Sequence, residues 1–149
     1  MSSKNHTLRV ALVFKGTVYQ ERAFTRTSEP IVTLGEDEDN DFVLPAESLP
    51  EAFEMFERTE GGYTVRFSEK LDGSIHIDDE EHDLEELAGE EAVKVDSVRT
   101  ADGAVDIYEL EVVQGDWGLL KLGDMEIFFQ LQGEPGAVAG RGLRGLDMP

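Results

Sequence analysis

Residues 61–77 read GGYTVRFSEKLDGSIHI, and this stretch decides the fold class. Apolar side chains occupy every second position of 63–67 with polar neighbours between them, which is the pattern of a half-buried β-strand. Asp72-Gly73 then gives a turn signal, and the alternation starts again at Ile75. The segment therefore predicts two short strands joined by a turn.

Similar runs occupy most of the chain, with turn signals between them. The pattern lacks the helix between successive strands that a parallel α/β fold needs. About eleven short strands spaced in this way are typical of an all-β sandwich or barrel. The other strand-like runs are 8–14, 18–24, 31–34, 42–44, 53–58, 93–98, 105–113, 117–122 and 125–131.

The apolar positions of these runs predict the hydrophobic core, because a sandwich buries one face of each sheet. The large rings of the last two runs are included, since core packing is the simplest explanation for them. The expected core residues are Phe53, Met55, Tyr63, Val65, Ile75, Trp117 and Phe128.

Residues 79–91 interrupt the β pattern with a run of acids. Leu84 and Leu87 within it have the spacing of an apolar face on a helix. We therefore predict one short helical insertion near residues 81–88.

The composition changes again at the end of the chain. Residues 133–149 are rich in glycine and show no alternation, which is typical of a flexible linker. The predicted organisation is one sandwich domain over 1–132 and a flexible linker or tail over 133–149.

The chain of 149 residues has a formal net charge of −20 and no cysteine. A surface this negative repels nucleic-acid backbones and anionic lipid headgroups. A chain without cysteine has no disulfides or thiolate metal sites, and it fits a reducing compartment. We therefore expect a cytoplasmic protein whose partners are other proteins, with no nucleic acid and no membrane insertion.

Two acidic constellations have metal-like spacing. Asp37-x-Asp39-x-Asp41 has the opening spacing of a calcium loop, but Phe42 stands where that loop needs glycine. The second set is His76, Asp78, Asp79 and His82. Both sets are more simply explained as solvated surface residues, so we expect no metal and no other cofactor.

Catalytic groups are not evident in the sequence either. Ser74 lies in Gly-Ser-Ile, without the Gly-x-Ser-x-Gly sequence of a nucleophile elbow. His6 lies close to the N-terminus, and the carboxylates are too abundant to single out a catalytic pair. We expect no enzymatic activity.

Three segments, taken in order, resemble the forkhead-associated (FHA) domain family. Residues 31–45, IVTLGEDEDNDFVLP, are similar to the family's Gly-Arg … Asn-Asp-Ile-Val-Leu stretch. Residues 53–65 resemble its His-Ala-x-Ile … Gly-Gly-x-Trp/Tyr-x-Leu stretch, and residues 72–77 resemble its Asn-Gly-Thr-x-Val-Asn-Gly motif. The resemblance covers roughly residues 8–131. It implies a β-sandwich that presents the loops at one end to a phosphothreonine peptide.

The residues that grip the phosphate in that family are replaced in this chain. The resemblance places Glu36 at a phosphate-binding Arg, and Pro50 and Glu51 at a Ser and a second Arg. Asp72 stands in place of the Asn that holds the peptide backbone, and Phe53 in place of the motif's His. An Arg–phosphate bond is worth ~1.5–3 kcal/mol, whereas a carboxylate repels phosphate. We therefore expect that phosphothreonine recognition has been lost.

The expected binding surface is the loop end of the sandwich, whose negative field would attract a basic peptide or surface of a protein partner. We call it the acidic loop end and define it by Glu36, Asp37, Asp39, Pro50, Glu51, Asp72, Gly73 and Ser74. The prediction is a non-catalytic protein–protein interaction module with an FHA-like fold. Two alternatives stay open: a phosphopeptide site rebuilt from Ser48 or Arg58 with Lys70, and a structural sandwich that self-associates.

The chain also resembles FHA-like modules at the N-termini of large myxobacterial proteins linked to gliding motility. Such modules precede long linkers and membrane-spanning regions, which suits the glycine-rich residues 133–149. The resemblance implies an adaptor on the cytoplasmic side of an envelope or motility assembly, which includes the cytoplasmic module of a membrane-anchored protein.

Overall fold

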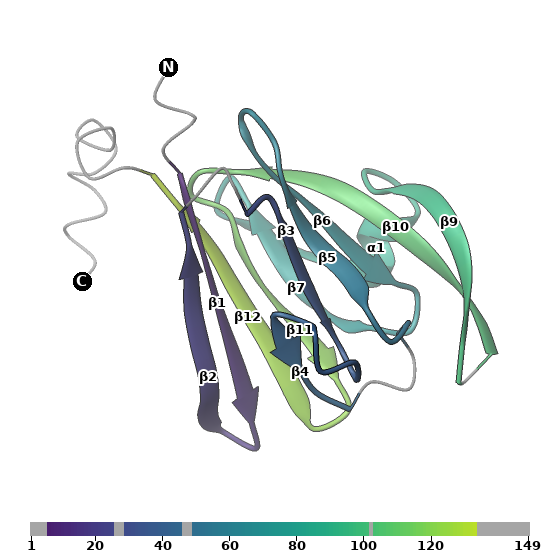
Figure 1. Cartoon of the computed structure of the whole chain (residues 1–149). Coiled ribbons are helices and arrows are strands. Elements are labelled where there is room, and N and C mark those ends of the chain that lie inside the picture. The colour runs from purple at the N-terminus through teal and green to yellow at the C-terminus, as the bar shows by residue number, and fades with distance from the viewer. Residues whose placement is uncertain (1–5, 26–28, 46–48, 102, 134–149) are drawn as a thin grey trace.

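The computed structural model describes residues 6–25, 29–45, 49–101 and 103–133. In this part of the chain, twelve strands form two six-stranded sheets, and one short helix accompanies them (Figure 1). The predicted all-β sandwich is confirmed, with twelve strands where about eleven were expected.

The first sheet contains both ends of the described chain. Its strand order is β2-β1-β12-β11-β7-β8, and every neighbouring pair is antiparallel. The last described strand therefore pairs with the first. Its strands are β1 (Thr7–Phe14), β2 (Thr17–Phe24), β7 (Asp72–Ile77), β8 (Glu80–Asp83), β11 (Trp117–Leu122) and β12 (Met125–Gln132).

The second sheet has the order β4-β3-β5-β6-β10-β9. Its pairs are antiparallel except for the short parallel pair of β3 and β4. Its strands are β3 (Ile31–Gly35), β4 (Phe42–Val43), β5 (Phe53–Arg58), β6 (Gly62–Ser68), β9 (Val93–Thr100) and β10 (Gly103–Val113).

The core lies between the two sheets. Phe56 of β5 and Phe129 of β12 meet there edge to face, with their ring centroids 5.3 Å apart. Burying a large apolar side chain of this kind contributes about 1.5–3 kcal/mol. Five of the seven predicted core residues are buried: Phe53, Met55, Tyr63, Val65 and Ile75.

The prediction that Trp117 and Phe128 are core residues was wrong. Both lie on the outer face of the first sheet and are only partly buried. Successive residues of a strand point to opposite faces, so Phe129 takes the inward position beside Phe128. Trp117 instead stacks on the ring of His76, with the ring centroids 3.8 Å apart.

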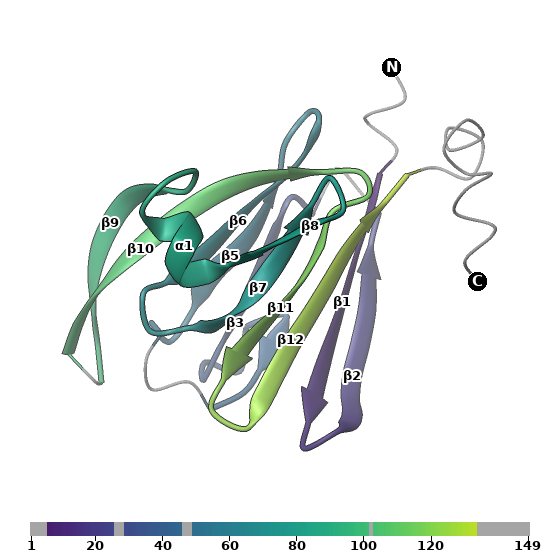
Figure 2. The same ribbon diagram turned by 180° about the vertical axis from the view of Figure 1, so that it is seen from behind.

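The helix is shorter than predicted. The helix α1 spans Leu84–Ala88, and the residues before it form strand β8, which pairs with β7. A tight turn at Asp78 and Asp79, both with positive φ, reverses the chain between these strands. Leu84 and Leu87 are buried as their spacing predicted, and Figure 2 shows α1 beside β8.

The hairpin of β9 and β10 lies at one edge of the second sheet. In both views it reaches away from the body on the side opposite β1 and β2 (Figures 1 and 2). Only β10 joins it to the rest of the sheet, through its pairing with β6, so β9 is an edge strand.

The predicted tail, residues 133–149, lies outside the described residues from position 134 onward. Among the residues that the structure describes, no helix is long and apolar enough to cross a membrane.

Candidate functional site

The turn after β3 depends on a glycine. Gly35 has a φ of +149°, and an added Cβ would lie 2.2 Å from the Glu51 carbonyl oxygen. A side chain at this position therefore collides with the neighbouring backbone. The absent Cβ lets the segment after β3 approach the segment before β5.

Asn40 holds these two segments together. Its Nδ2 group donates to the carbonyl oxygens of Asp37 and Glu51, both at 2.8 Å. The Asp37 amide donates to the Glu51 carbonyl oxygen at 3.1 Å. We call the two tied segments, residues 35–41 and 50–51, the loop pair.

The loop pair carries most of the predicted site. The loop pair has a half-buried Pro50 and four exposed acids: Glu36, Asp37, Asp39 and Glu51. Hydrogen bonds to buried Asn40 fix the backbone that carries these carboxylates. The structure thus brings five of the eight predicted site residues together.

The other three predicted residues lie on β7, in the first sheet. Asp72 starts this strand at the same end of the sandwich, and its register partner on β11 is Lys121. Gly73 packs against β11, where an added Cβ would meet the Leu119 carbonyl oxygen at 2.1 Å. Ser74 lies farther along, between Leu119 and Asp83, so it faces the outer side of the sheet.

The calcium-like spacing does not converge on one point. Asp37 Oδ1 accepts a hydrogen bond from the Asp39 amide at 3.0 Å. Asp41 turns the other way and accepts from the Thr33 amide at 2.9 Å and from Arg22 at 3.4 Å. Across residues 6–25, 29–45, 49–101 and 103–133, no three His, Asp or Glu side chains are placed to hold a metal ion.

The rebuilt phosphate site is separated in space. Arg58 ends β5 and Lys70 follows β6, and because these strands are antiparallel, the two cations lie at opposite ends of the sheet. Arg58 donates to the Tyr63 hydroxyl at 3.1 Å and to the His6 carbonyl oxygen at 2.9 Å. Burial raises the pKa of Tyr63, although the hydrogen bond and charge of Arg58 oppose that shift. Ser48 lies outside the described residues.

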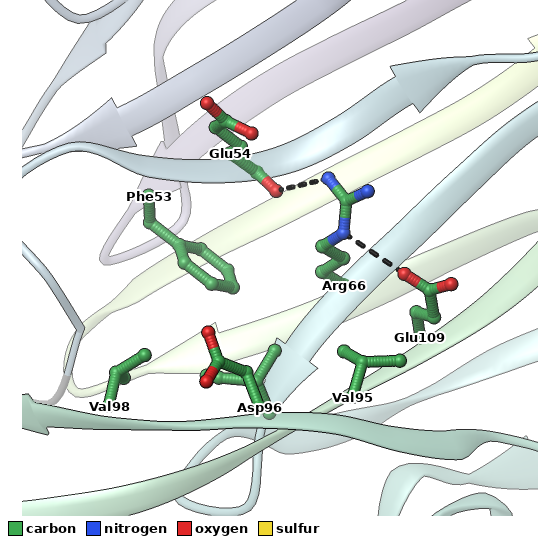
Figure 3. A pocket seen from close by; sticks show the side chains of 8 residues that line it. Phe53, Glu54, Arg66, Val95, Asp96, Val98 and Glu109 are labelled. Carbon is green, nitrogen blue, oxygen red and sulfur yellow. Dashed lines mark hydrogen bonds and ion pairs between the residues drawn. The ribbon is translucent and has the colours of Figure 1, made fainter.

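Sequence patterns missed a hollow on the outer face of the second sheet (Figure 3). It has a volume of about 350 Å³ and is lined by residues of β5, β6, β9 and β10. Its apolar lining is Phe53, Val95, Val98 and Ile107. One feature of the sequence points to this hollow: Val93 and Val95 alternate as core residues would, yet both are exposed in the structure.

Arg66 stands at one side of this hollow. It donates to Glu57 at 2.6 Å, to Glu109 at 3.2 Å and to the Glu54 carbonyl oxygen at 3.2 Å. Burial lowers the pKa of its guanidinium, but the hydrogen bonds and charges of Glu57 and Glu109 outweigh this and raise it overall. All three guanidinium nitrogens of Arg66 therefore donate to acceptors of the protein itself.

Comparison with protein-family models, with curated proteins and with solved structures found no match to this chain.

Proposed function

We propose that this chain is a non-catalytic protein–protein interaction module whose acidic loop end binds a surface bearing Lys or Arg. The observation that carries the proposal is the clamp around Asn40, which ties two acidic segments into one loop pair. Carboxylates on a fixed backbone lose less entropy on binding than carboxylates on a mobile loop. Their field also steers a cationic partner toward this end.

The proposal includes an FHA-like fold that has lost phosphothreonine recognition. Its support is the ordered set of motifs, together with the sandwich of two mostly antiparallel sheets. Phosphate charge about 4 Å from a carboxylate such as Glu36 costs about 4 kcal/mol at an effective dielectric of 20. Pro50 offers neither a hydroxyl nor an amide hydrogen in compensation.

The larger setting that we propose is a bacterial envelope or motility assembly, with this module as a cytoplasmic adaptor. The support is the resemblance to modules that precede long linkers, and the glycine-rich sequence that follows β12 here.

Self-association of the sandwich is the rival with a structural observation behind it. Strand β9 is a sheet edge, and Val93 and Val95 on it are exposed. A second copy would also bring a net charge of −20, which opposes pairing at low salt. Sedimentation at several protein concentrations separates the adaptor from the self-associating sandwich. The adaptor stays monomeric, whereas the sandwich forms larger species as the concentration rises.

Calorimetry with three peptides tests the proposed function. The peptides are a phosphothreonine peptide, its unphosphorylated match and a peptide of alternating Ala and Lys. We expect binding of the lysine peptide alone, with an affinity that falls as salt is added. Micromolar binding that depends on the phosphate would overturn the proposal.

A further inference from the structure

The hollow beneath the β9–β10 hairpin has the apolar surface that a long cationic side chain needs. Phe53 and Ile107 are buried beneath it, and Val95 remains 45% exposed on its β9 wall. The aliphatic stems of Lys and Arg bury readily along such surfaces while the charged head stays near water or a carboxylate. Figure 3 shows Phe53, Val95 and Val98 around the same space.

The charges around the hollow favour a cation. Arg66 is paired with both Glu57 and Glu109, so two negative charges already outweigh its single positive charge. Asp96 on the β9 side and Glu54 on the β5 side make no ion pair with any residue in the described part of the chain (Figure 3). Acidic side chains therefore outnumber the one guanidinium: Glu54, Asp96 and Glu109 line the hollow, and Glu57 pairs with Arg66 beside it.

Strand β9 adds backbone groups beside this space. It is the last strand of its sheet, so none of the strands that the structure describes pairs with the edge turned away from β10. An extended chain lying along such an edge can form main-chain hydrogen bonds. A partner segment could thus lie on β9 while one of its side chains enters the hollow.

We propose that the hollow on the outer face of the second sheet receives a Lys or Arg side chain from an extended basic segment of a partner protein. This inference rests on the proposed function and names a second contact for the same partner. The hollow adjoins the loop pair, because β5 begins with Phe53 and Glu54 only one residue after Glu51. A basic segment drawn to the loop pair can therefore continue into the hollow.

A matched pair of substitutions tests the inference. Val95→Lys places a cation inside the hollow, and Val113→Lys makes the same change on β10, at a similarly exposed position outside the lining. The readout is the fluorescence anisotropy of a labelled peptide of alternating Ala and Lys, with the Ala and Gln peptide as the ligand control. Circular dichroism and thermal unfolding check that each variant keeps its fold.

We expect Val95→Lys to weaken lysine-peptide binding about tenfold, because it fills the hollow and repels the incoming cation. Val113→Lys should change the affinity by less than about twofold. Asp96→Asn keeps the size of the side chain and should weaken binding about threefold, whereas Asp79→Asn, on the β7–β8 turn, should leave it unchanged.

The results separate this inference from the proposed function. Equal losses in Val95→Lys and Val113→Lys would mean a general charge effect and would overturn the hollow. If Val95→Lys keeps its affinity for the lysine peptide and Glu51→Lys loses it, binding at the hollow is refuted and binding at the loop pair stands. A loss in Val95→Lys without one in Glu51→Lys would support the hollow and count against the loop pair. A wild-type protein that does not bind the lysine peptide would overturn both.

Discussion

The loop pair and the hollow both carry negative charge, but they are built differently. In the loop pair, exposed carboxylates stand on backbone that Asn40 clamps through carbonyl oxygens. In the hollow, Asp96 lies beside apolar Val95 and Phe53. Charge on an open surface steers a partner, whereas charge beside apolar surface can also hold the stem of its side chain. The same partner chemistry can therefore be attracted at one place and retained at the other.

Gly35→Ala, in the loop pair, should have the largest effect of the substitutions considered. Its Cβ would meet the Glu51 carbonyl oxygen at 2.2 Å, in a backbone conformation with a φ of +149°. We expect the free energy of unfolding to fall by about 3 kcal/mol, measured by urea denaturation. Gly16→Ala is the control: its φ is +86° and nothing lies within 4 Å, so only the backbone cost of about 1 kcal/mol remains. Equal losses in the two variants would refute the close packing of the loop pair.

Asn40→Ala removes the clamp without a clash. Two part-buried hydrogen bonds are lost, although each carbonyl oxygen keeps one backbone amide donor, so we expect a loss of about 2 kcal/mol in unfolding free energy. Amide chemical shifts should change in residues 36–39 and 51 and stay constant in 95–98. Glu38→Ala, an exposed change in the same segment, is the control. Shift changes spread evenly over the chain would contradict a local clamp.

The sequence predicted the loop pair better than its clamp. Motif order brought Glu36 and Glu51 to the same end of the sandwich, because strand alternation and turns can be read locally. The bond between Asn40 and Glu51 joins residues eleven positions apart, and no periodic pattern encodes it. The hollow was missed because its lining comes from four strands, β5, β6, β9 and β10, and the pattern within one strand does not show how strands come together.

The errors in predicting the fold have similar causes. Residues 81–83 are acidic or polar and read as helix, yet pairing with β7 makes them strand. Trp117 and Phe128 read as core because alternation shows that two faces differ without showing which one points inward. Gly118 shows which face of β11 points inward. An added Cβ at Gly118 would lie 2.7 Å from the ring of buried Phe129, so Trp117 beside it points outward.

Arg66→Gln should lower the stability of the fold and raise the affinity of the hollow for the lysine peptide. It removes the ion pairs with Glu57 and Glu109, which are partly exposed, so we expect a stability loss of about 1 kcal/mol. Arg66 is the one cation among the described residues that line the hollow, so lysine-peptide affinity should rise about threefold. Arg9→Gln breaks the exposed pair with Glu21 and should change neither quantity appreciably. Weaker peptide binding in Arg66→Gln would contradict the hollow as a cation site.

Glu36→Arg gives the smallest effect, and it concerns binding alone. It should weaken lysine-peptide binding about threefold and flatten the salt dependence of the association rate, measured by stopped flow at several salt concentrations. It should not create phosphothreonine binding, because Pro50 and Glu51 stay unsuited to phosphate. Glu60→Arg, in the turn between β5 and β6, is the control of equal charge.

Chemical-shift mapping of the wild-type domain tests most directly whether this is an acidic module that reads basic partners. Amide shifts are followed while the alternating Ala and Lys peptide, and then a phosphothreonine peptide, are added at equal concentrations. The prediction is that the lysine peptide shifts residues 36–41, 50–54 and 95–98, and that the phosphothreonine peptide shifts none of them. Shifts in the loop pair caused by the phosphothreonine peptide, with none from the lysine peptide, would contradict it.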